Sequence, residues 1–239
     1  MPKSPEPTRR DALLIIPGFG YNRAAQKVFR SVRATLAAEG IDVYVPTYIE
    51  RGGLAESRTE LQEFLHEHHL GQYQRLHVFA FIAGAWTLNP MLERERPANL
   101  ATVIYDRSPM QERAPRVADE KLHFLTWVKF GRNVFDMART PYTPDTAAGV
   151  RIGIMVETVP TKLMKRYAKP VLSYGPLHFE CAAFGQRYND CTYLALSHDQ
   201  LYTRFQELVP EVLTFMRTGR YSAGANRAPP THDPLPMPP

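Results

Sequence analysis

The chain has 239 residues, 44% of them hydrophobic, which is enough to bury one sizeable core in a single domain. Its Lys and Arg residues give a net charge of +5 and are spread along the whole sequence, so a nucleic-acid partner is not expected. The first ten residues lack the pattern of a signal peptide, and the first apolar run is too short to span a membrane. We therefore expect a cytoplasmic protein without stable membrane insertion.

Both ends of the chain are rich in proline and poor in large apolar residues. Residues 1–10 and the tail at 222–239 are therefore expected to be disordered, which leaves a folded domain at 11–221. The two cysteines, Cys181 and Cys191, could form a disulfide in principle. Without an export signal such thiols are more often reduced and buried, and we expect that state here.

Apolar runs along the chain alternate between strand-like and helical patterns. The patterns predict strands at 12–16, 42–48, 76–82, 101–105, 150–156 and 192–196, and helices at 24–38, 61–69, 84–92 and 201–216. This alternation specifies the α/β class, with a mostly parallel sheet flanked by helices. The stretch at about 111–149 breaks the rhythm and is rich in aromatic residues, so it is predicted to be a helical lid insertion over a pocket.

Ligand sites in parallel sheets lie beyond the carboxyl ends of the strands, so the residues after each apolar run are the candidates for function. After the first run come Gly18, Phe19, Gly20 and Tyr21. The glycines allow backbone N–H groups to face an open pocket as in an oxyanion hole, although an ordinary turn is the alternative. The Tyr21 phenol could contact a substrate oxygen or pack on the next helix.

Two further segments follow strands in the same way. Ala80-Phe81-Ile82-Ala83-Gly84 has small residues around one position of a strand-to-helix turn, which indicates close backbone approach. His198 stands between Ser197 and Asp199, before the final helix, where a general base could reach that turn. A lone histidine is nevertheless more often structural.

Together these positions resemble the α/β-hydrolase family, and more loosely its small bacterial lipase-like members, over about residues 11–221. Pro17-Gly18-Phe19-Gly20 is similar to the family's His-Gly-x-Gly oxyanion loop, and His198 falls where the catalytic histidine comes. The segment at 80–84 resembles the Gly-x-Ser-x-Gly nucleophile elbow, with Phe81 and Ala83 as the flanking residues, but Ile82 stands at the serine. Isoleucine has no lone pair, so acyl transfer through a covalent intermediate cannot start there.

The resemblance leaves the other catalytic roles open. The acid of the triad would be Glu157 or Asp106, each of which follows a predicted strand. Ser108 and Ser197 are the alternatives for a displaced nucleophile, and both are ranked low. The histidines at 66, 68 and 69 lack partners at metal-like spacing, so we expect no metal and no cofactor. The basic residues at 162–169 are expected to form a solvated helix face.

Three hypotheses about function follow. The first is a non-catalytic pseudoenzyme that binds a small apolar or acyl-bearing ligand, or a protein partner that the sequence does not identify. The second is an enzyme of the same fold that uses His198 as a general base without covalent catalysis. The third is an esterase- or lipase-like hydrolase with a displaced nucleophile. A hydrogen bond from Asp106 or Glu157 to His198 would favour catalysis, because it orients the imidazole.

Overall fold

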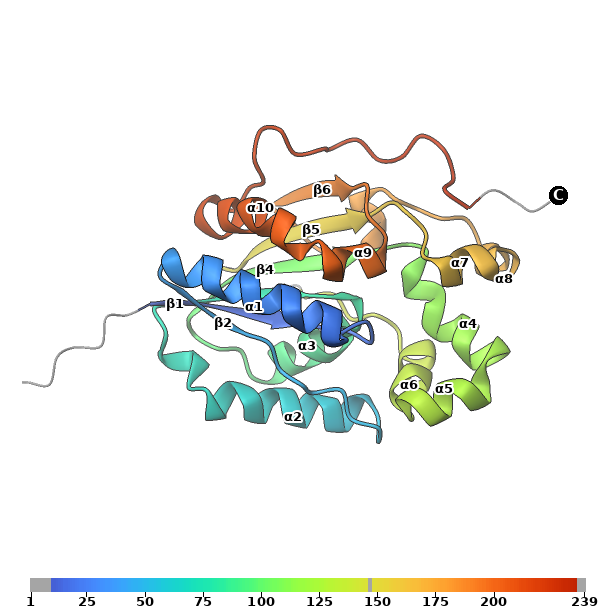
Figure 1. Cartoon of the computed structure of the whole chain (residues 1–239), viewed down its shortest axis with the longest axis horizontal. Coiled ribbons are helices and arrows are strands. Elements are labelled where there is room, and N and C mark those ends of the chain that lie inside the picture. The colour runs from blue at the N-terminus through green and yellow to red at the C-terminus, as the bar shows by residue number, and fades with distance from the viewer. Residues whose placement is uncertain (1–9, 146–147, 236–239) are drawn as a thin grey trace, which may run out of the picture.

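The computed structural model describes residues 10–145 and 148–235, and a six-stranded parallel sheet forms the centre of the molecule (Figure 1). The strand order is β2-β1-β3-β4-β5-β6, and every neighbouring pair is parallel. The strands are β1 (Asp11–Ile16), β2 (Ile41–Tyr44), β3 (Arg75–Ala80), β4 (Leu100–Arg107), β5 (Arg151–Glu157) and β6 (Asp190–Leu194). The predicted α/β class with a mostly parallel sheet is therefore confirmed.

Helices cover both faces of the sheet. One face is covered by α1 (Arg23–Ala38), α9 (His198–Thr203) and α10 (Phe205–Thr218), and the other by α2 (Leu54–Glu67) and α3 (Ile82–Arg94). Alternate residues of a strand point to opposite faces, so Leu13 and Ile15 join the first core while Leu14 and Ile16 join the second. In the described ranges, no helix has the length and apolar character needed to cross a bilayer.

Five short helices lie beyond the carboxyl ends of the strands (Figure 1). Between β4 and β5 come α4 (Ala114–Lys121), α5 (His123–Phe130) and α6 (Asn133–Arg139), and between β5 and β6 come α7 (Lys162–Arg166) and α8 (Ala168–Ser173). The described residues also form three short 3-10 helices, η1 (Leu70–Gln72), η2 (Gln111–Arg113) and η3 (Cys181–Phe184). The segment predicted as a lid is thus mainly helical over 111–139, whereas 140–145 and 148–149 are not helical and residues 146 and 147 lie outside the described residues. Its role as a lid stays a prediction.

The basic segment at 162–169 belongs to two helices and not to the single helix that the sequence suggested. Pro170 has no N–H to donate to the carbonyl of Arg166, which favours an interruption of the helix in front of it. The chain therefore ends α7 at Arg166 and starts α8 at Ala168.

The tail after α10 differs from its expected disorder over residues 222–235. The carbonyl of Asn226 accepts the backbone N–H of Tyr193 in β6 over 2.8 Å, and Arg227 forms a 2.9 Å ion pair with Asp190. Leu235 is buried in the same apolar cluster as Ile154. These contacts hold the tail against the edge of the sheet, although its proline-rich composition indicates no core of its own. Residues 1–9 and 236–239, also predicted to be disordered, lie outside the described residues.

The expectation of two reduced cysteines is wrong in this structure. Cys181 in η3 and Cys191 in β6 form a disulfide, and their Cα atoms are 6.5 Å apart. That separation lies within the range that a disulfide spans. Both residues are nearly buried, as predicted, so the error concerns their oxidation state and not their place in the core.

Candidate functional site

The start of α3 forms a tight strand-to-helix turn at the carboxyl edge of the sheet. β3 ends at Ala80, and α3 begins at Ile82, whose side chain is buried. A Cβ at Gly84 would lie 2.5 Å from the carbonyl oxygen of Ile16, so glycine is required where α3 packs on β1. The backbone at Ile82 is not strained, since His69 is the sole non-glycine residue of the described ranges with a positive φ. A nucleophile elbow, in contrast, is a strained turn.

The imidazole of His198 lies beside two buried carboxyl groups from neighbouring strands. His198 begins α9, and a capping box between Ser197 and Gln200 fixes the start of that helix. Nδ1 of His198 is 2.7 Å from Oε1 of Glu157 at the end of β5 and 3.4 Å from Oδ2 of Asp106 in β4. Strand ends that converge at one edge thus bring together the histidine and both carboxyl groups that the sequence offered. Glu157 is the closer partner.

Burial and crowding keep protons on this cluster. Burial, together with the negative charge of Asp106, raises the pKa of Glu157 well above its ordinary value. Burial by itself would lower the pKa of His198, but the charge of Glu157, the hydrogen bond to it and the nearby carboxyl group of Asp106 outweigh burial and raise that pKa well above its ordinary value. The raised pKa of His198 favours the protonated imidazole, which donates hydrogen bonds and has no lone pair with which to accept a proton.

The same three side chains are a possible donor set for a metal ion. One donor atom from each of Asp106, Glu157 and His198 lies within 4.8 Å of the others. Both oxygens of Asp106 and Oε2 of Glu157 are buried without a hydrogen-bond partner among the described residues. Two carboxylates and an imidazole suit a divalent cation. The 2.7 Å contact between Nδ1 and Oε1 leaves no room for an ion between these two atoms. We therefore treat the cluster as proton-sharing, and the expected absence of a metal stays a prediction.

The side chain of Tyr202 fills the glycine loop after β1. The backbone N–H of Gly18 donates a buried hydrogen bond to the hydroxyl oxygen of Tyr202 over 2.5 Å. A Cβ at Gly20 would come within 2.7 Å of the Tyr202 ring, and that ring stacks on Phe81 with centroids 4.1 Å apart. The glycines therefore make room for a tyrosine. The expectation that Gly18 presents its N–H to an open pocket is wrong, because Tyr202 already satisfies this donor.

A cavity of about 420 Å³ lies between the start of α3 and helices α4 to α7. Its volume is within the range of small-molecule sites. Most of the lining is apolar, and the residues are Phe19, Gly20, Ile82, Ala83, Gln111, Ala114, Pro115, Ala118, Leu122, Leu125, Thr126, Lys129, Phe130, Val134, Met137, Leu163, His198 and Asp199. Of the residues predicted to bind a ligand, Phe19, Gly20 and Ala83 thus line this cavity, whereas Phe81 is buried behind it under Tyr202.

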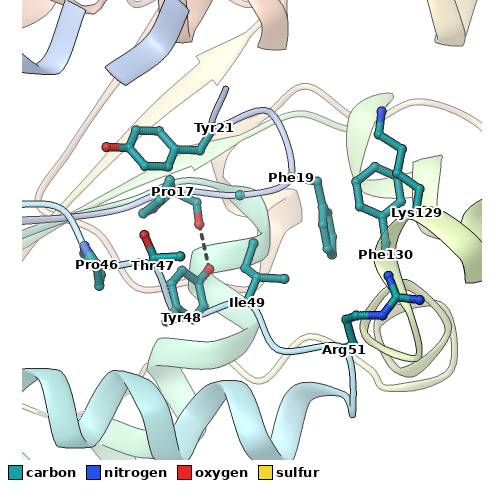
Figure 2. A pocket seen from close by; sticks show the side chains of 11 residues that line it. Pro17, Phe19, Tyr21, Pro46, Thr47, Tyr48, Ile49, Arg51, Lys129 and Phe130 are labelled. Atoms are coloured by element: carbon teal, nitrogen blue, oxygen red, sulfur yellow. Dashed lines mark hydrogen bonds between the residues drawn. The ribbon is translucent and has the colours of Figure 1, made fainter. Parts of the chain in front are cut away.

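A second pocket, of about 220 Å³, shares part of this lining (Figure 2). Phe19 and Phe130, whose rings meet edge to face at 5.0 Å, line both cavities. Figure 2 shows the Tyr48 hydroxyl donating to the carbonyl oxygen of Pro17, a 2.6 Å bond that ties the loop after β2 to the glycine loop. Tyr21 lines this smaller pocket, whereas His198 lines the larger one.

Neither serine considered as a displaced nucleophile lines the larger cavity. Ser108 is 1% exposed, and its hydroxyl oxygen accepts the backbone N–H of Gln111 over 3.2 Å. The hydroxyl of Ser197 caps α9 by accepting the backbone N–H of Gln200. Both hydroxyls therefore hold local turns, as serine side chains commonly do.

Tyr202 is the site residue that sequence analysis missed. It comes four residues after His198, a spacing that places two side chains on the same face of a helix. Their rings are 5.3 Å apart. This i,i+4 spacing was the available signal, and it required knowing that the final helical segment begins at His198 and not at about Leu201.

Comparisons with known proteins agree on the fold. No family model matches the chain, and no curated protein matches it in sequence. Among solved structures it is similar to the type II thioesterase BorB from the borrelidin biosynthetic cluster, at 17% identity over 89% of this chain and 93% of that chain, with a TM-score of 0.54. The pyrethroid hydrolase PytH is 14% identical over 87% and 98% of the two chains, with a TM-score of 0.55. Est1E from Butyrivibrio proteoclasticus is 12% identical over 87% and 88%, with a TM-score of 0.53.

These likenesses, together with the parallel sheet and the tight turn at α3, show that the chain has the α/β-hydrolase fold. Sequence identities of this size speak for the fold alone. The function therefore has to be argued from the site.

Proposed function

We propose that this protein binds a small apolar or acyl-bearing molecule in the cavity of about 420 Å³ and does not carry out covalent acyl transfer. One observation carries the proposal. Ile82 lines the cavity together with His198, at the position of the strand-to-helix turn where this fold places a nucleophile. An alkyl side chain cannot form an acyl intermediate, so a ligand held there is bound and not transferred to the protein.

Tyr202 supports the same conclusion. Acyl transfer needs backbone donors that are free to stabilise a developing oxyanion. The N–H of Gly18 is already bonded to the Tyr202 hydroxyl, so this donor of the loop is not free. Two requirements for a serine-esterase mechanism, the nucleophile and this oxyanion donor, are thus unmet in the same site.

The lining of the cavity indicates the class of ligand. Side chains from α4, α5 and α6 offer an apolar surface that suits a hydrocarbon portion. His198 lines the cavity together with Ile82, and its raised pKa favours a protonated imidazole that donates to a hydrogen-bond acceptor. An acyl group matches this lining, because its hydrocarbon chain can pack on the apolar side chains and its carbonyl oxygen can accept a hydrogen bond from His198.

The hydrogen bond between His198 and Glu157 favours a second candidate, an enzyme that works without a covalent intermediate. A carboxyl group 2.7 Å from Nδ1 fixes the orientation of the ring, as in known acid-base sites. Because the pKa of His198 is raised, the imidazole favours the role of proton donor and would act as a base only above that raised pKa. The two candidates therefore differ in turnover and not in the cavity they use.

Ligand binding and turnover are tested together. The neutral fluorophore 1-N-phenylnaphthylamine is titrated into the purified full chain and then displaced with methyl decanoate. Ala118→Trp fills the cavity and should abolish binding, whereas Ala37→Trp, on the exposed side of α1, is the matched control. A panel of p-nitrophenyl acyl esters reports turnover at neutral and alkaline pH.

Binding that is lost in Ala118→Trp and kept in Ala37→Trp, with no ester turnover, supports the binding function. Slow turnover that vanishes in His198→Gln and shows no initial burst supports the second candidate. A stoichiometric burst of p-nitrophenol from the wild type overturns both, because it reports a covalent acyl intermediate that neither mechanism contains.

The cellular compartment of the protein does not follow from the cavity and has to be considered separately. The sequence predicted a cytoplasmic protein, and that stays a prediction. The disulfide between Cys181 and Cys191 is an argument against it, since disulfides persist in oxidising compartments and are rare in the cytosol. The ligand itself is the partner we propose, with no role for nucleic acid.

A further inference from the structure

Helix α5 exposes a group of large apolar side chains to solvent. Phe124, Leu125, Trp127 and Val128 are 74%, 65%, 51% and 55% exposed. We call these four residues the α5 patch. Large exposed apolar groups that lie side by side on a folded protein mark an interaction surface more often than isolated ones do. The α5 patch lies among the helices beyond the carboxyl ends of the strands, away from the covered faces of the sheet (Figure 1).

The position of α5 is fixed by the rest of the fold. The guanidinium of Arg51 donates to the carbonyl oxygens of Trp127 and Val128 over 3.1 and 2.9 Å. On the other side of the helix, Thr126 is buried and lines the cavity with Phe130. The helix is therefore held with its polar backbone end satisfied and its apolar side chains directed to solvent.

The α5 patch is continuous with the mouth of the large cavity. Leu125 belongs to both, being 65% exposed and also part of the cavity lining. Leu163 in α7, across the cavity, is likewise 36% exposed and lines it. A surface that covers the α5 patch would thus also meet the opening through which an apolar ligand enters.

The charge around the patch is positive. The segments 114–139 and 162–173 carry three acidic residues, Asp119, Glu120 and Asp136, and each of them is paired with a basic residue of these segments or with His123. Lys129 lines the cavity, and Lys162 and Lys165 lie in α7 with the lining residue Leu163; none of the three lysines forms an ion pair among the described residues, and Asp199 is the acidic residue of the lining. Aromatic and apolar groups flanked by lysines are the composition that favours the interface of an anionic bilayer.

We propose that the α5 patch is a peripheral docking surface for an anionic lipid bilayer, which places the cavity mouth against the membrane. The apolar side chains would enter the headgroup region while the lysines contact lipid phosphates, without any segment crossing the bilayer. This goes beyond the proposed function, because docking does not depend on which ligand the cavity holds or on whether it is turned over. A second copy of this chain on the same face is the competing outcome of the test.

The experiment is flotation of the full chain with vesicles of phosphatidylcholine, with and without about 30% phosphatidylglycerol, and without added ligand. We expect binding to the anionic vesicles that weakens between about 0.05 and about 0.5 M salt, because salt screens the lysines. The double variant Phe124→Ser/Trp127→Ser should bind at least roughly tenfold more weakly. Tyr188→Ser, which removes another exposed aromatic ring, is the matched control and should bind as the wild type does.

Circular dichroism of each variant tests whether it is folded. We expect folded variants, because Phe124 and Trp127 are exposed and contribute little to the core. In a Trp86→Phe background, Trp127 is the sole tryptophan, and its emission should shift to the blue on anionic vesicles. Equal binding by the wild type and the double variant, or no flotation by the wild type, overturns the proposal. So does a concentration-dependent dimer in light scattering that the double variant abolishes, since a second copy then covers the patch.

Discussion

The hydroxyl oxygen of Tyr202 accepts the backbone N–H of Gly18, so a side chain of α9 occupies the glycine loop that the sequence had left open for a substrate. The relationship links two parts of the chain separated by 184 residues. It also explains both glycines, since a side chain at Gly20 would collide with the Tyr202 ring. The loop is therefore built to receive its own tyrosine.

Removal of the Tyr202 hydroxyl should destabilise the protein. Tyr202→Phe keeps the stacked ring but leaves the buried N–H of Gly18 without an acceptor, so we expect the free energy of unfolding to fall by about 1 to 3 kcal/mol in urea denaturation. Tyr188→Phe is the control, because Tyr188 is exposed and loss of its hydroxyl should have little effect on the free energy of unfolding. Equal stability of wild type and Tyr202→Phe would contradict the importance of this bond.

Restoring a serine should not by itself restore esterase chemistry. Ile82→Ser supplies a hydroxyl at the turn, but the backbone there lacks the strained geometry of an elbow and the Gly18 donor stays occupied. We expect no burst of p-nitrophenol from Ile82→Ser above the level of Ile82→Ala. A burst that matches the enzyme concentration would show instead that Ile82 alone blocks an otherwise complete site.

The stability of the protein should fall as pH rises, in part through His198 and Glu157. Both folded pKa values lie above their ordinary values of 6.5 and 4.5, so these groups stabilise the fold fully below those values. Their contribution is lost as pH rises through the folded pKa values, when the buried groups must release protons. In Glu157→Gln the side chain cannot ionise and His198 loses a negative partner, so the decline should be smaller.

Calorimetric melting temperatures at several pH values between about 5 and about 9 measure this difference. The comparison of two curves removes the contribution of groups that both proteins share. Parallel curves for the wild type and Glu157→Gln would show that the cluster holds no extra protons in the folded state.

The disulfide should contribute measurably to stability. Cys181 and Cys191 close a short loop, so reduction is expected to lower the free energy of unfolding by about 2 to 3 kcal/mol. The double variant Cys181→Ser/Cys191→Ser should be insensitive to reductant. Thiol titration of the denatured, unreduced protein checks the premise, because two free thiols there would mean that the bond does not form.

The sheet and part of the site could be predicted from sequence, because both depend on local pattern. Short apolar runs gave each strand to within a few residues, and residues that follow parallel strands must meet at one edge. This rule, together with the resemblance to α/β-hydrolases, made Asp106, Glu157 and His198 candidates for one site and put Ile82 at the turn. It could not choose between the two carboxyl groups, which differ by 0.7 Å in their distance from Nδ1.

What could not be predicted depends on contacts between distant segments. The filling of the glycine loop requires the angle at which α9 leaves the sheet, which no local pattern contains. The tail was expected to be disordered from its prolines, yet Arg227 finds Asp190 and Leu235 finds a core made by other elements. Composition describes what a segment can bury by itself and not what a neighbour offers it.

The contact of residues 222–235 with β6 affects the tendency of the molecule to aggregate. β6 is the last strand of the sheet, and an uncovered last strand offers its free N–H and C=O groups to strands of other molecules. Here Asn226 takes the N–H of Tyr193 and the hydroxyl of Thr192, so part of that row is already used. The proline-rich end thus protects the edge of the sheet from pairing with other molecules. In a chain shortened to residue 221, β6 would be exposed to edge-to-edge aggregation.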